Sequence, residues 1–278
     1  MKRIYFLLLF IFLTSCSNTH VNKKNLSGEI EGDVTWSGDI FVSGDLIIKG
    51  NLFIEPGTKI IVDNRDSQNK GEKFPADDYN KLDPTRLEKY EKSHTEIEVK
   101  GNIFSVGTLN NPIIFTSASK YPANADWVSL TIHGGNSSIA FNRIEWSREG
   151  IVLLGSHLNS NIYNNFINNS FWSAISSGVS NANIVDNEIW NCGHEGIDIQ
   201  GGRPYVINNK VYESHTGIVI LGGSPVIINN TFSNVGDDIH IQNSKPLLKK
   251  NYAKIASKNK LWTYNNFSYQ TFGQPIIS

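Results

Sequence analysis

The chain has 278 residues, which is long enough for a large core in one elongated domain. Its 25 lysine and arginine residues nearly balance its 26 aspartate and glutamate residues, so the formal net charge is −1 and no broad basic field attracts nucleic acid. Charged residues make up 18% of the chain, and no long amphipathic helix pattern appears after the N-terminus. This composition predicts many short strands joined by turns.

The first residues have the pattern of a secretory signal. Lys2 and Arg3 precede an apolar run over residues 4–13, which is too short to span a bilayer. The run ends in Leu13-Thr14-Ser15-Cys16, which resembles the lipobox of bacterial lipoproteins. This resemblance implies that residues 1–15 are a signal peptide and that an acylated Cys16 holds the protein on a membrane. We therefore expect a lipid-anchored protein of the bacterial cell envelope, at the outer membrane if the organism is Gram-negative.

Two segments outside the regular pattern are also distinctive. Residues 16–27 are polar and predict a tether. Residues 64–95 are strongly charged and predict a loop insertion, with a short helix from Pro84 because proline suits a first helical position. Beyond Cys16 the chain contains only Cys192, so no internal disulfide is expected. No Cys/His metal spacing surrounds Cys192, and we expect neither a metal nor another cofactor.

The segment from about Ser137 to Ile255 repeats one pattern several times. Each copy has two or three aliphatic residues, an Asn, an apolar residue, a polar turn and then a Gly-Ile-x-Ile strand. A period of 21 to 23 residues is typical of a solenoid, in which each repeat forms one coil. The shared residues are Asn142, Asn165, Asn187, Asn209, Asn230 and Asn251.

Aliphatic residues keep fixed offsets from this Asn, and these offsets assign the faces of three strands per coil. Side chains alternate across a strand, so one set per strand can point into the coil. Stacked in parallel, the strands predict an all-β, single-stranded parallel β-helix over residues 28–255, with about 21–23 residues per coil. The expected inward sets are Ile139, Ile162, Ile184, Val206, Ile227 and Leu248; Ile144, Ile167, Ile189, Val211, Phe232 and Ala253; and Ile151, Ile175, Ile197, Ile218 and Ile239.

The Asn column is expected to be scaffold. A sharp bend between two strands can require a left-handed backbone, which Asn tolerates well. Amides stacked one coil apart can also hydrogen-bond along the axis. After Asn251 the period breaks, so residues 256–278 are expected to cap the last coil and shield it from pairing with another molecule.

The array resembles the right-handed parallel β-helix repeat family. Its relatives include pectate lyases, polygalacturonases, alginate epimerases and a nitrous-oxide-reductase accessory protein with carbohydrate-binding repeats. The resemblance covers nearly all of the mature chain, but this fold hosts many activities. A left-handed hexapeptide helix is the alternative fold, indicated by short segments near Gly38, Gly44 and Gly50; coils of 21 or more residues argue against it.

Four residues on or just before the Gly-Ile-x-Ile strands are candidates for catalysis: Asp198, Glu195, Asp237 and His240. The period separates Glu195 from Asp237, and Asp198 from His240, by two coils, or roughly 9–10 Å. This distance is near the upper limit for the carboxyl pair of an inverting glycosidase. Solvated turn residues are the alternative interpretation of the same four positions. The outward basic residues do not form one column, which disfavours a lyase.

Two short motifs resemble those of a known enzyme family but do not support its activity here. Gly236-Asp237-Asp238 and Gly193-His194-Glu195-Gly196 resemble polygalacturonase elements, but their order along the chain is reversed. That activity is therefore not carried over. Three aromatic residues that follow the Asn bend, Trp146, Trp190 and Tyr212, are candidates for carbohydrate binding, because exposed rings stack on sugar rings; packing against a loop is the alternative.

Three functions remain open from the sequence. The first is a lipid-anchored envelope protein that binds polysaccharide or another surface partner. The second is a carbohydrate-active enzyme, a glycoside hydrolase or epimerase rather than a lyase. The third is a structural spacer of the envelope. The expected partners are the membrane, through the lipid anchor, and a polysaccharide, but no nucleic acid.

Overall fold

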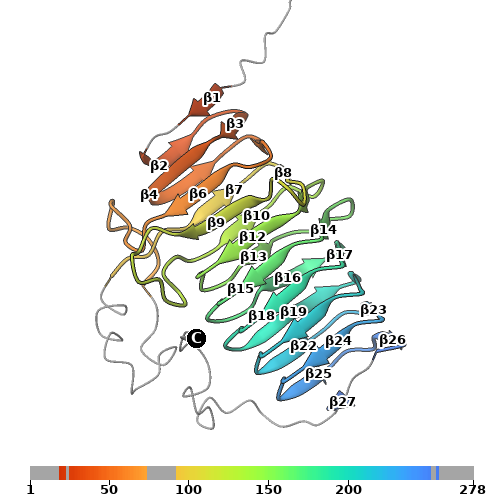
Figure 1. Cartoon of the computed structure of the whole chain (residues 1–278). Helices are drawn as coiled ribbons and strands as arrows, with labels where there is room; N and C mark the ends of the chain where they lie inside the picture. Colours follow the sequence, from red (N-terminus) through yellow and green to blue (C-terminus); the bar gives the residue numbers. More distant parts are fainter. Residues whose placement is uncertain (1–18, 23–24, 74–91, 252–254, 257–278) are drawn as a thin grey trace, which may run out of the picture.

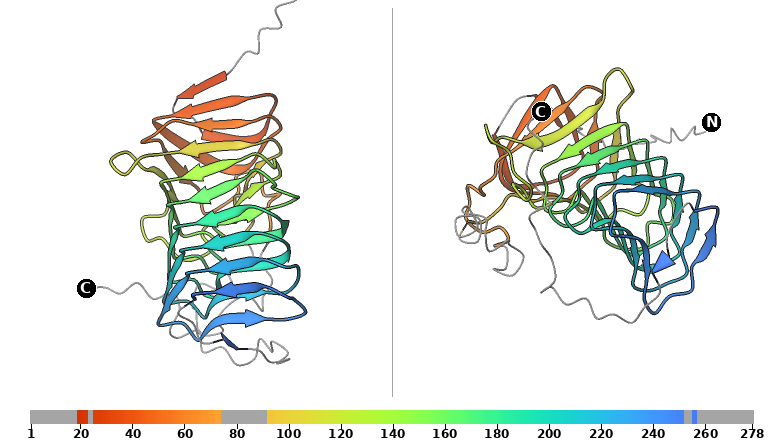
Figure 2. Two further views of the ribbon diagram at one scale, coloured as in Figure 1. Left: turned by 90° about the vertical axis from the view of Figure 1, so that its right-hand side faces the viewer. Right: turned by 60° about the horizontal axis from the view of Figure 1, so that its bottom comes forward.

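The computed structural model describes residues 19–22, 25–73, 92–251 and 255–256, and these residues form strands and turns without a helix. The strands stack into an elongated solenoid, and every strand pairing is parallel (Figure 1). Further views show the strands stacked in columns along the length of the solenoid (Figure 2). The parallel β-helix predicted from the 21- to 23-residue period is therefore confirmed.

Three columns of strands, which we call sheets 1 to 3, form the walls of the solenoid, and the chain visits them in that order. Sheet 1 contains ten strands. They are β1 (Thr19–Asn22), β3 (Val34–Ser37), β5 (Leu52–Ile54), β8 (Ile103–Val106), β11 (Ser138–Ala140), β14 (Asn161–Tyr163), β17 (Asn183–Val185), β20 (Tyr205–Ile207), β23 (Val226–Ile228) and β26 (Leu247–Lys249).

Sheets 2 and 3 are joined at the N-terminal end by β2 (Asn25–Ile30) and β4 (Asp39–Ile48), since β4 pairs with strands of both columns. Sheet 2 continues with β6 (Lys59–Val62), β9 (Ile113–Ser117), β12 (Asn142–Glu145), β15 (Phe166–Asn168), β18 (Glu188–Trp190), β21 (Lys210–Tyr212) and β24 (Thr231–Ser233). Sheet 3 continues with β7 (Ile97–Val99), β10 (Leu130–Ile132), β13 (Ile151–Leu153), β16 (Ile175–Ser180), β19 (Glu195–Gly202), β22 (Thr216–Ile220), β25 (Asp237–Ile241) and β27 (Ile255–Ala256).

The core is a set of aliphatic columns inside the solenoid. The predicted inward residues of sheet 3, from Ile151 to Ile239, are all fully buried, and those of sheets 1 and 2 are fully buried up to Ile227 and Val211. Leu248 and Phe232, near the C-terminal end, are partly buried against the same core. Each fully buried aliphatic side chain contributes about 1.5–3 kcal/mol, so these columns supply the main stabilisation of the fold.

The expected Asn ladder runs along the corner between sheets 1 and 2. In each step from Asn142 to Asn251, Nδ2 of one Asn donates to Oδ1 of the next at 2.9–3.1 Å. The same Oδ1 accepts the backbone N–H of the preceding Asn at 2.9–3.1 Å. Five of the six residues are at most 2% exposed, so the amides replace hydrogen bonds that water cannot make.

The explanation given for the Asn residues themselves was wrong by one position. The left-handed backbone lies at the residue before each ladder Asn, where Phe141, Asn164, Asp186, Asn208, Asn229 and Lys250 have φ between 53° and 58°. From Asn142 to Asn230, each ladder Asn instead begins or directly precedes a strand of sheet 2. The buried amide, rather than tolerance of a bend, is therefore what the ladder position requires.

A second ladder occupies another corner in the first coils. Asn51 donates its backbone N–H to Oδ1 of Asp33 at 2.8 Å, and Asn102 and Asn136 continue the series at 2.9 Å each. This ladder follows the corner between sheets 3 and 1. It ends at Asn136, in the coil where the other ladder begins at Asn142; Oδ1 of Asn142 accepts a hydrogen bond from Ser105 in the preceding coil.

The predicted boundaries can be compared with the described residues. Strands β1 and β2 begin before residue 28, so part of the predicted tether over 16–27 is strand. The 64–95 insertion is described at its two ends, and the helix expected from Pro84 lies outside the described residues. Cys16 with its signal peptide, Ala253, and the cap over residues 257–278 also lie outside them. Within the described segments, no helix is long and apolar enough to cross a membrane.

Candidate functional site

The candidate site lies on the outer face of sheet 3, at the corner where the chain passes from sheet 2 to sheet 3. Two interruptions of the coil pattern enter at this corner, between β6 and β7 and between β9 and β10. Irregular segments project at this side of the solenoid (Figure 1). The regular coils cross the same corner in short turns, which hold charged and aromatic side chains against the edge of sheet 3.

Two of the catalytic candidates, Glu195 and Asp198, lie in β19. Asp198 points away from the solenoid interior, because its neighbours Ile197 and Ile199 are both fully buried in the core. Asp198 and Glu195 are nevertheless only 6% exposed each, so they are not the solvated turn residues of the alternative interpretation. Gln200 Nε2 donates to Asp198 Oδ2 at 3.0 Å. Asp198 Oδ1 and Glu195 Oε2 are buried without a hydrogen-bond partner.

A third carboxyl group, Glu149, joins this pair. It lies in the column of Glu195, with one coil between them, as the backbone hydrogen bonds from Gly150 to Ser173 (3.0 Å) and from Ala174 to Glu195 (3.3 Å) show. Burial, opposed by the charge of Arg148 and assisted by those of Asp198 and Glu195, raises the pKa of Glu149 to about 7. Burial and the charge of Glu195 also raise the pKa of Asp198 to about 6. We call Glu149, Glu195 and Asp198 the carboxylate cluster.

Glu149 was missed from the sequence, although a signal for it was present. Arg148-Glu149-Gly150-Ile151 occupies the same place in its coil as His194-Glu195-Gly196-Ile197 does two coils later. Both segments lead into a strand of sheet 3, β13 or β19. Aligning all coils at this corner, rather than the last three alone, would have paired the two glutamates.

A stack of three side chains borders the carboxylate cluster. The Arg148 guanidinium lies over Trp172, 5.7 Å from the ring centroid, and Trp172 stacks on His194 with centroids 3.8 Å apart. His194 Nδ1 lies 3.6 Å from Glu195 Oε1. Arg148 Nη1 lies 3.4 Å from Glu72 and 4.0 Å from Glu149, so its charge is directed toward the insertion and the first glutamate.

The other two catalytic candidates lie farther along the solenoid. The register aligns Glu195 with Thr216 and Asp237, and Asp198 with Val219 and His240, which gives the expected separation of two coils. Thr216 is fully buried and Val219 is 3% exposed. These two side chains stand between the pairs, so the four predicted residues do not form one constellation.

The three aromatic candidates also do not form a single group. Trp190 and Tyr212 lie at paired positions of β18 and β21, on the outer face of sheet 2, with ring centroids 4.3 Å apart. Trp190 Nε1 also donates to Glu188 at 2.8 Å. Trp146 lies apart from them, at the corner after β12, with a left-handed backbone at φ 66°. Two of the three predicted rings therefore form one half-buried platform.

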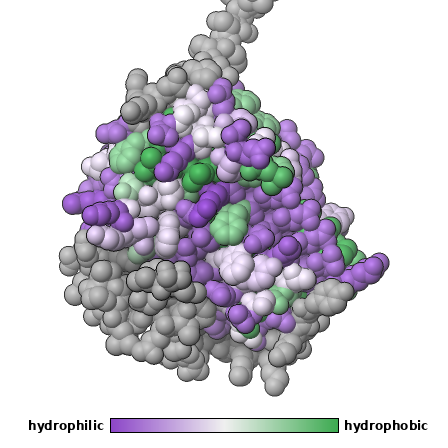
Figure 3. Space-filling view, in the orientation of Figure 1, coloured by the Kyte–Doolittle hydropathy of each residue, from purple (hydrophilic) through white to green (hydrophobic). Residues whose placement is uncertain are grey.

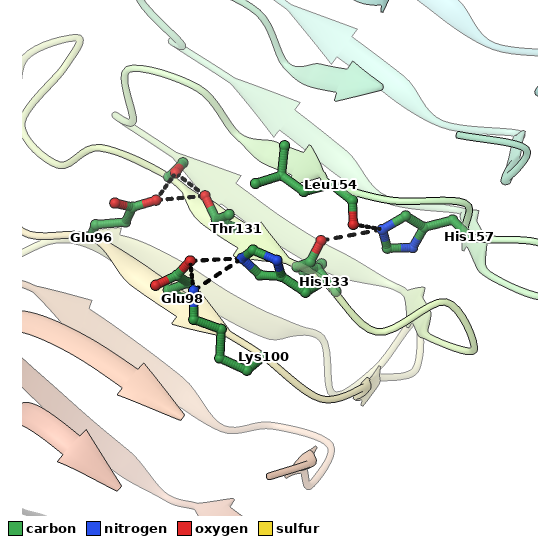
Figure 4. Close-up of polar contacts among 9 residues, drawn as sticks. Glu96, Glu98, Lys100, Thr131, His133, Leu154 and His157 are labelled. Carbon is green, nitrogen blue, oxygen red and sulfur yellow. Dashed lines mark hydrogen bonds and ion pairs between the residues drawn. The ribbon is translucent and has the colours of Figure 1, made fainter. Parts of the chain in front are cut away.

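The first coils carry their own polar group on the outer face of sheet 3 (Figure 4). Glu98 forms an ion pair with Lys100 and lies 2.7 Å from His133 Nε2. Glu96 accepts hydrogen bonds from Thr131 at 2.6 Å and Ser129 at 3.2 Å. Both of these carboxylates have partners, and neither keeps a buried oxygen without one, as Glu195 and Asp198 do. We interpret the group as structural.

An apolar cavity and the polarity of the surface are weaker marks of a functional site. A cavity of about 300 Å³ at the corner between sheets 1 and 2 is lined mainly by apolar groups of Leu109, Pro112, Phe141 and Phe166. It lies at a different corner from the carboxylate cluster, and no acidic residue lines it. Figure 3 shows hydrophilic residues over most of one face, with apolar residues scattered among them. We therefore place the candidate site at the carboxylate cluster, where charge and burial coincide.

Metal and thiol chemistry receive no support from the described residues. Within them, no group of three or more His, Cys, Asp or Glu side chains could hold a metal ion. Cys192 is fully buried, and burial raises the pKa of its thiol to about 12, so it is not a nucleophile at neutral pH.

Comparison with protein families gives a match to a β-helix family. Residues 122–251 and 173–272 match the family model described as a right handed beta helix region. Together these ranges cover more than half of the chain. Neither the curated proteins nor the solved structures contain a significant match.

Proposed function

The chain belongs to the right-handed β-helix family, and from this we propose that it is an envelope protein that binds polysaccharide at the carboxylate cluster. The fold alone does not define a function, because β-helices host many activities. The proposal therefore depends on the site, and the lipobox-like Leu13-Thr14-Ser15-Cys16 supports the location.

The observation that carries the proposal is the pair of buried carboxylate oxygens without partners, Asp198 Oδ1 and Glu195 Oε2. Leaving a buried acceptor unsatisfied costs about 1–3 kcal/mol, and a charged one costs more. Native proteins rarely retain such a cost without a role, so each unsatisfied group needs an explanation. Sugar hydroxyl and amino groups are donors that would satisfy both oxygens.

The site also has features that suit a chain-like ligand. The coils repeat along the axis, so equivalent outer positions recur at intervals of roughly 4.8 Å. The Trp190–Tyr212 platform lies around the corner from β19, separated from Glu195 by one short turn. Aromatic rings combine a large apolar surface with defined geometry, which suits the apolar face of a sugar. An extended polysaccharide could thus contact both groups.

The test is a binding screen of the full-length protein in detergent against neutral, acidic and amino-sugar glycans. We expect at least one glycan to bind, and Asp198→Asn and Glu195→Gln to weaken its binding by tenfold or more, because each change removes a charged acceptor. Asp186→Asn is the matched control, since Asp186 is exposed in a left-handed turn where equivalent residues are Asn. Binding that is unchanged in both cluster variants would refute the proposal, and binding of no glycan would favour the spacer.

A second candidate function is glycoside hydrolysis, favoured by the pKa of about 7 for Glu149, which leaves this buried carboxyl group partly protonated at neutral pH. Near neutral pH, a protonated Glu149 could donate its proton to the leaving oxygen, while an ionised Asp198 accepts a proton from the attacking water. Their strands are two coils apart, or roughly 9–10 Å, near the limit for an inverting pair. Sugar products that disappear in Glu149→Gln, with binding retained, would support hydrolysis; their absence in the unmodified protein would exclude it for the glycans tested.

A further inference from the structure

We propose that the carboxylate cluster recognises a primary ammonium group, such as the free amino group of an amino sugar within a polysaccharide. This inference rests on the proposed polysaccharide binding and specifies the class of sugar. Three features of the cluster support it: an imbalance of charge, unused hydrogen-bond acceptors and an opening to the surface.

The site carries an imbalance of charge. Glu195 and Asp198 both lie in β19, their charges act on Glu149 from two coils away, and Arg148 is a cation beside Glu149. Arg148 is held over Trp172 and directed toward Glu72 and Glu149. The charged groups that act on Asp198 are Glu195, which repels its carboxylate, and His194, which attracts it. The Glu195–Asp198 end of the cluster therefore has excess negative charge when its carboxyl groups ionise.

The cluster also contains hydrogen-bond acceptors that are not used. Asp198 and Glu195 are more than nine-tenths buried, and Asp198 Oδ1 and Glu195 Oε2 accept no hydrogen bond. An ammonium group carries three N–H donors and a positive charge, whereas a sugar hydroxyl carries one donor and no charge. Charge-assisted hydrogen bonds are about twice as strong as neutral ones. An ammonium group therefore satisfies two carboxylate oxygens in a way that a single hydroxyl cannot.

The cluster lacks the ligands of a metal site and is accessible from the surface. The described residues offer no group of three side chains that could hold a metal ion, so two carboxylates without further ligands favour an organic cation. The cluster reaches the surface at two places. Glu149 keeps 21% of its side chain exposed, and Gln200, which contacts Asp198, is exposed. A ligand can thus approach between these two side chains, and Gln200 can turn aside to release Asp198 Oδ2.

The experiment compares two oligosaccharides of equal length, a pentamer of glucosamine and a pentamer of N-acetylglucosamine. Acetylation replaces the ammonium group with a neutral amide and leaves the sugar ring unchanged, so the pair tests the requirement for the positive charge. We expect the full-length protein in detergent to bind the glucosamine pentamer at least tenfold more tightly by calorimetry near pH 6.5. Asp198→Asn and Glu195→Gln should remove this preference, and Asp186→Asn should retain it.

The outcomes separate this inference from the proposed function. Equal affinity for the two pentamers, or a preference that survives in both cluster variants, would overturn the ammonium site and leave polysaccharide binding intact. Calcium binding that depends on Asp198, without binding of the glucosamine pentamer, would overturn it as well. Thermal unfolding of each variant confirms that a lost preference reflects the site, because a misfolded variant would show a lower or absent transition.

Discussion

The first coils and the regular array both bury acidic side chains, but the carboxylates of the two regions differ in their hydrogen-bond partners. Asp66 in the first coils is 1% exposed and accepts backbone N–H groups of Asp45, Gln68, Lys70 and Gly71 at 2.6–3.1 Å. In the array, Glu195 and Asp198 are similarly buried, yet each keeps an oxygen without a partner. The same solenoid thus uses acids as structural anchors at one end and leaves them unsatisfied farther along, where we infer a ligand.

The two regions also differ in how they close their corners. The array relies on an Asn ladder that is buried from Asn142 to Asn230, whereas the ladder from Asp33 to Asn136 is half-buried or exposed. In the first coils the corner depends on close backbone contact at glycine. A Cβ added to Gly101 would lie 2.3 Å from the carbonyl oxygen of Gly50. Buried amides stabilise the first kind of corner, and the absence of a side chain permits the second.

The largest effect is expected for Asn187→Leu in the array. This change removes the donor to Ile162 O and the acceptor for the Asn165 backbone N–H, at 2.9 and 3.1 Å. Both groups are buried, so we expect a loss of about 3–5 kcal/mol in the free energy of unfolding, measured by denaturant titration. Asn102→Ala, in the half-buried ladder, should cost about 1 kcal/mol or less. Similar losses for the two variants would contradict the distinction between the ladders.

A smaller effect is expected for Gly101→Ala in the first coils. The added methyl group would overlap the backbone of Gly50, which has no flexible side chain that could move. We expect a loss of about 2–3 kcal/mol, seen as a lower midpoint of thermal unfolding. Gly135→Ala is the control, because its Cβ would meet its nearest neighbour at 3.5 Å, an ordinary contact. If the Gly135 variant lost as much stability, close packing at Gly101 would not be the cause.

The stability of the protein should depend on pH through Asp198. Its folded-state pKa of about 6 exceeds the ordinary Asp pKa of 3.8, so between these pH values the folded state binds more protons than the unfolded state. Stability attributable to this group therefore falls as pH rises from about 4 to 6, by at most about 3 kcal/mol. Asp198→Asn should remove this dependence and unfold at a higher temperature than the unmodified protein at pH 7.5.

Glu98 in the first coils provides the contrast for this experiment. Its hydrogen bonds to Lys100 and His133 lower its pKa despite partial burial, so its contribution is present above the ordinary Glu pKa and is lost as pH falls. Glu98→Gln should therefore not stabilise the protein at pH 7.5. A stabilised Glu98→Gln variant, or a destabilised Asp198→Asn variant, would remove the difference between the two groups of acids.

The smallest effect is expected at the aromatic platform. Replacing Trp190 or Tyr212 by alanine removes one ring from the stacked pair, and we expect glycan affinity to fall by about three- to tenfold. Tyr205→Ala is a suitable control, because Tyr205 is 48% exposed on sheet 1, away from the platform. Equal weakening by the Tyr205 variant would argue against a defined path for the ligand across sheet 2.

The sequence predicted the parts of this molecule that repeat. The inward columns and the Asn ladder follow from a fixed period, because stacking places the same requirement on the same position of every coil. The carboxylate cluster was predicted in part: Asp198 and Glu195 were identified, but Glu149 was not, because its segment belongs to an earlier coil that was not aligned with them. Their burial was also not predicted, since it depends on how side chains fill the irregular corner rather than on strand alternation.

The direction of the Asn ladder has a consequence for the length of the protein. Each Asn contacts both neighbouring coils: Asn165, for example, donates to Ile139 O behind it and to Asn187 Oδ1 ahead. Because each step repeats the same contacts, removing one whole period of about 22 residues would join Asn142 directly to an equivalent partner. The array can therefore gain or lose complete coils without creating a new kind of junction. Solenoid length is thus a modular variable, and evolution could adjust the reach of the protein independently of its cross-section.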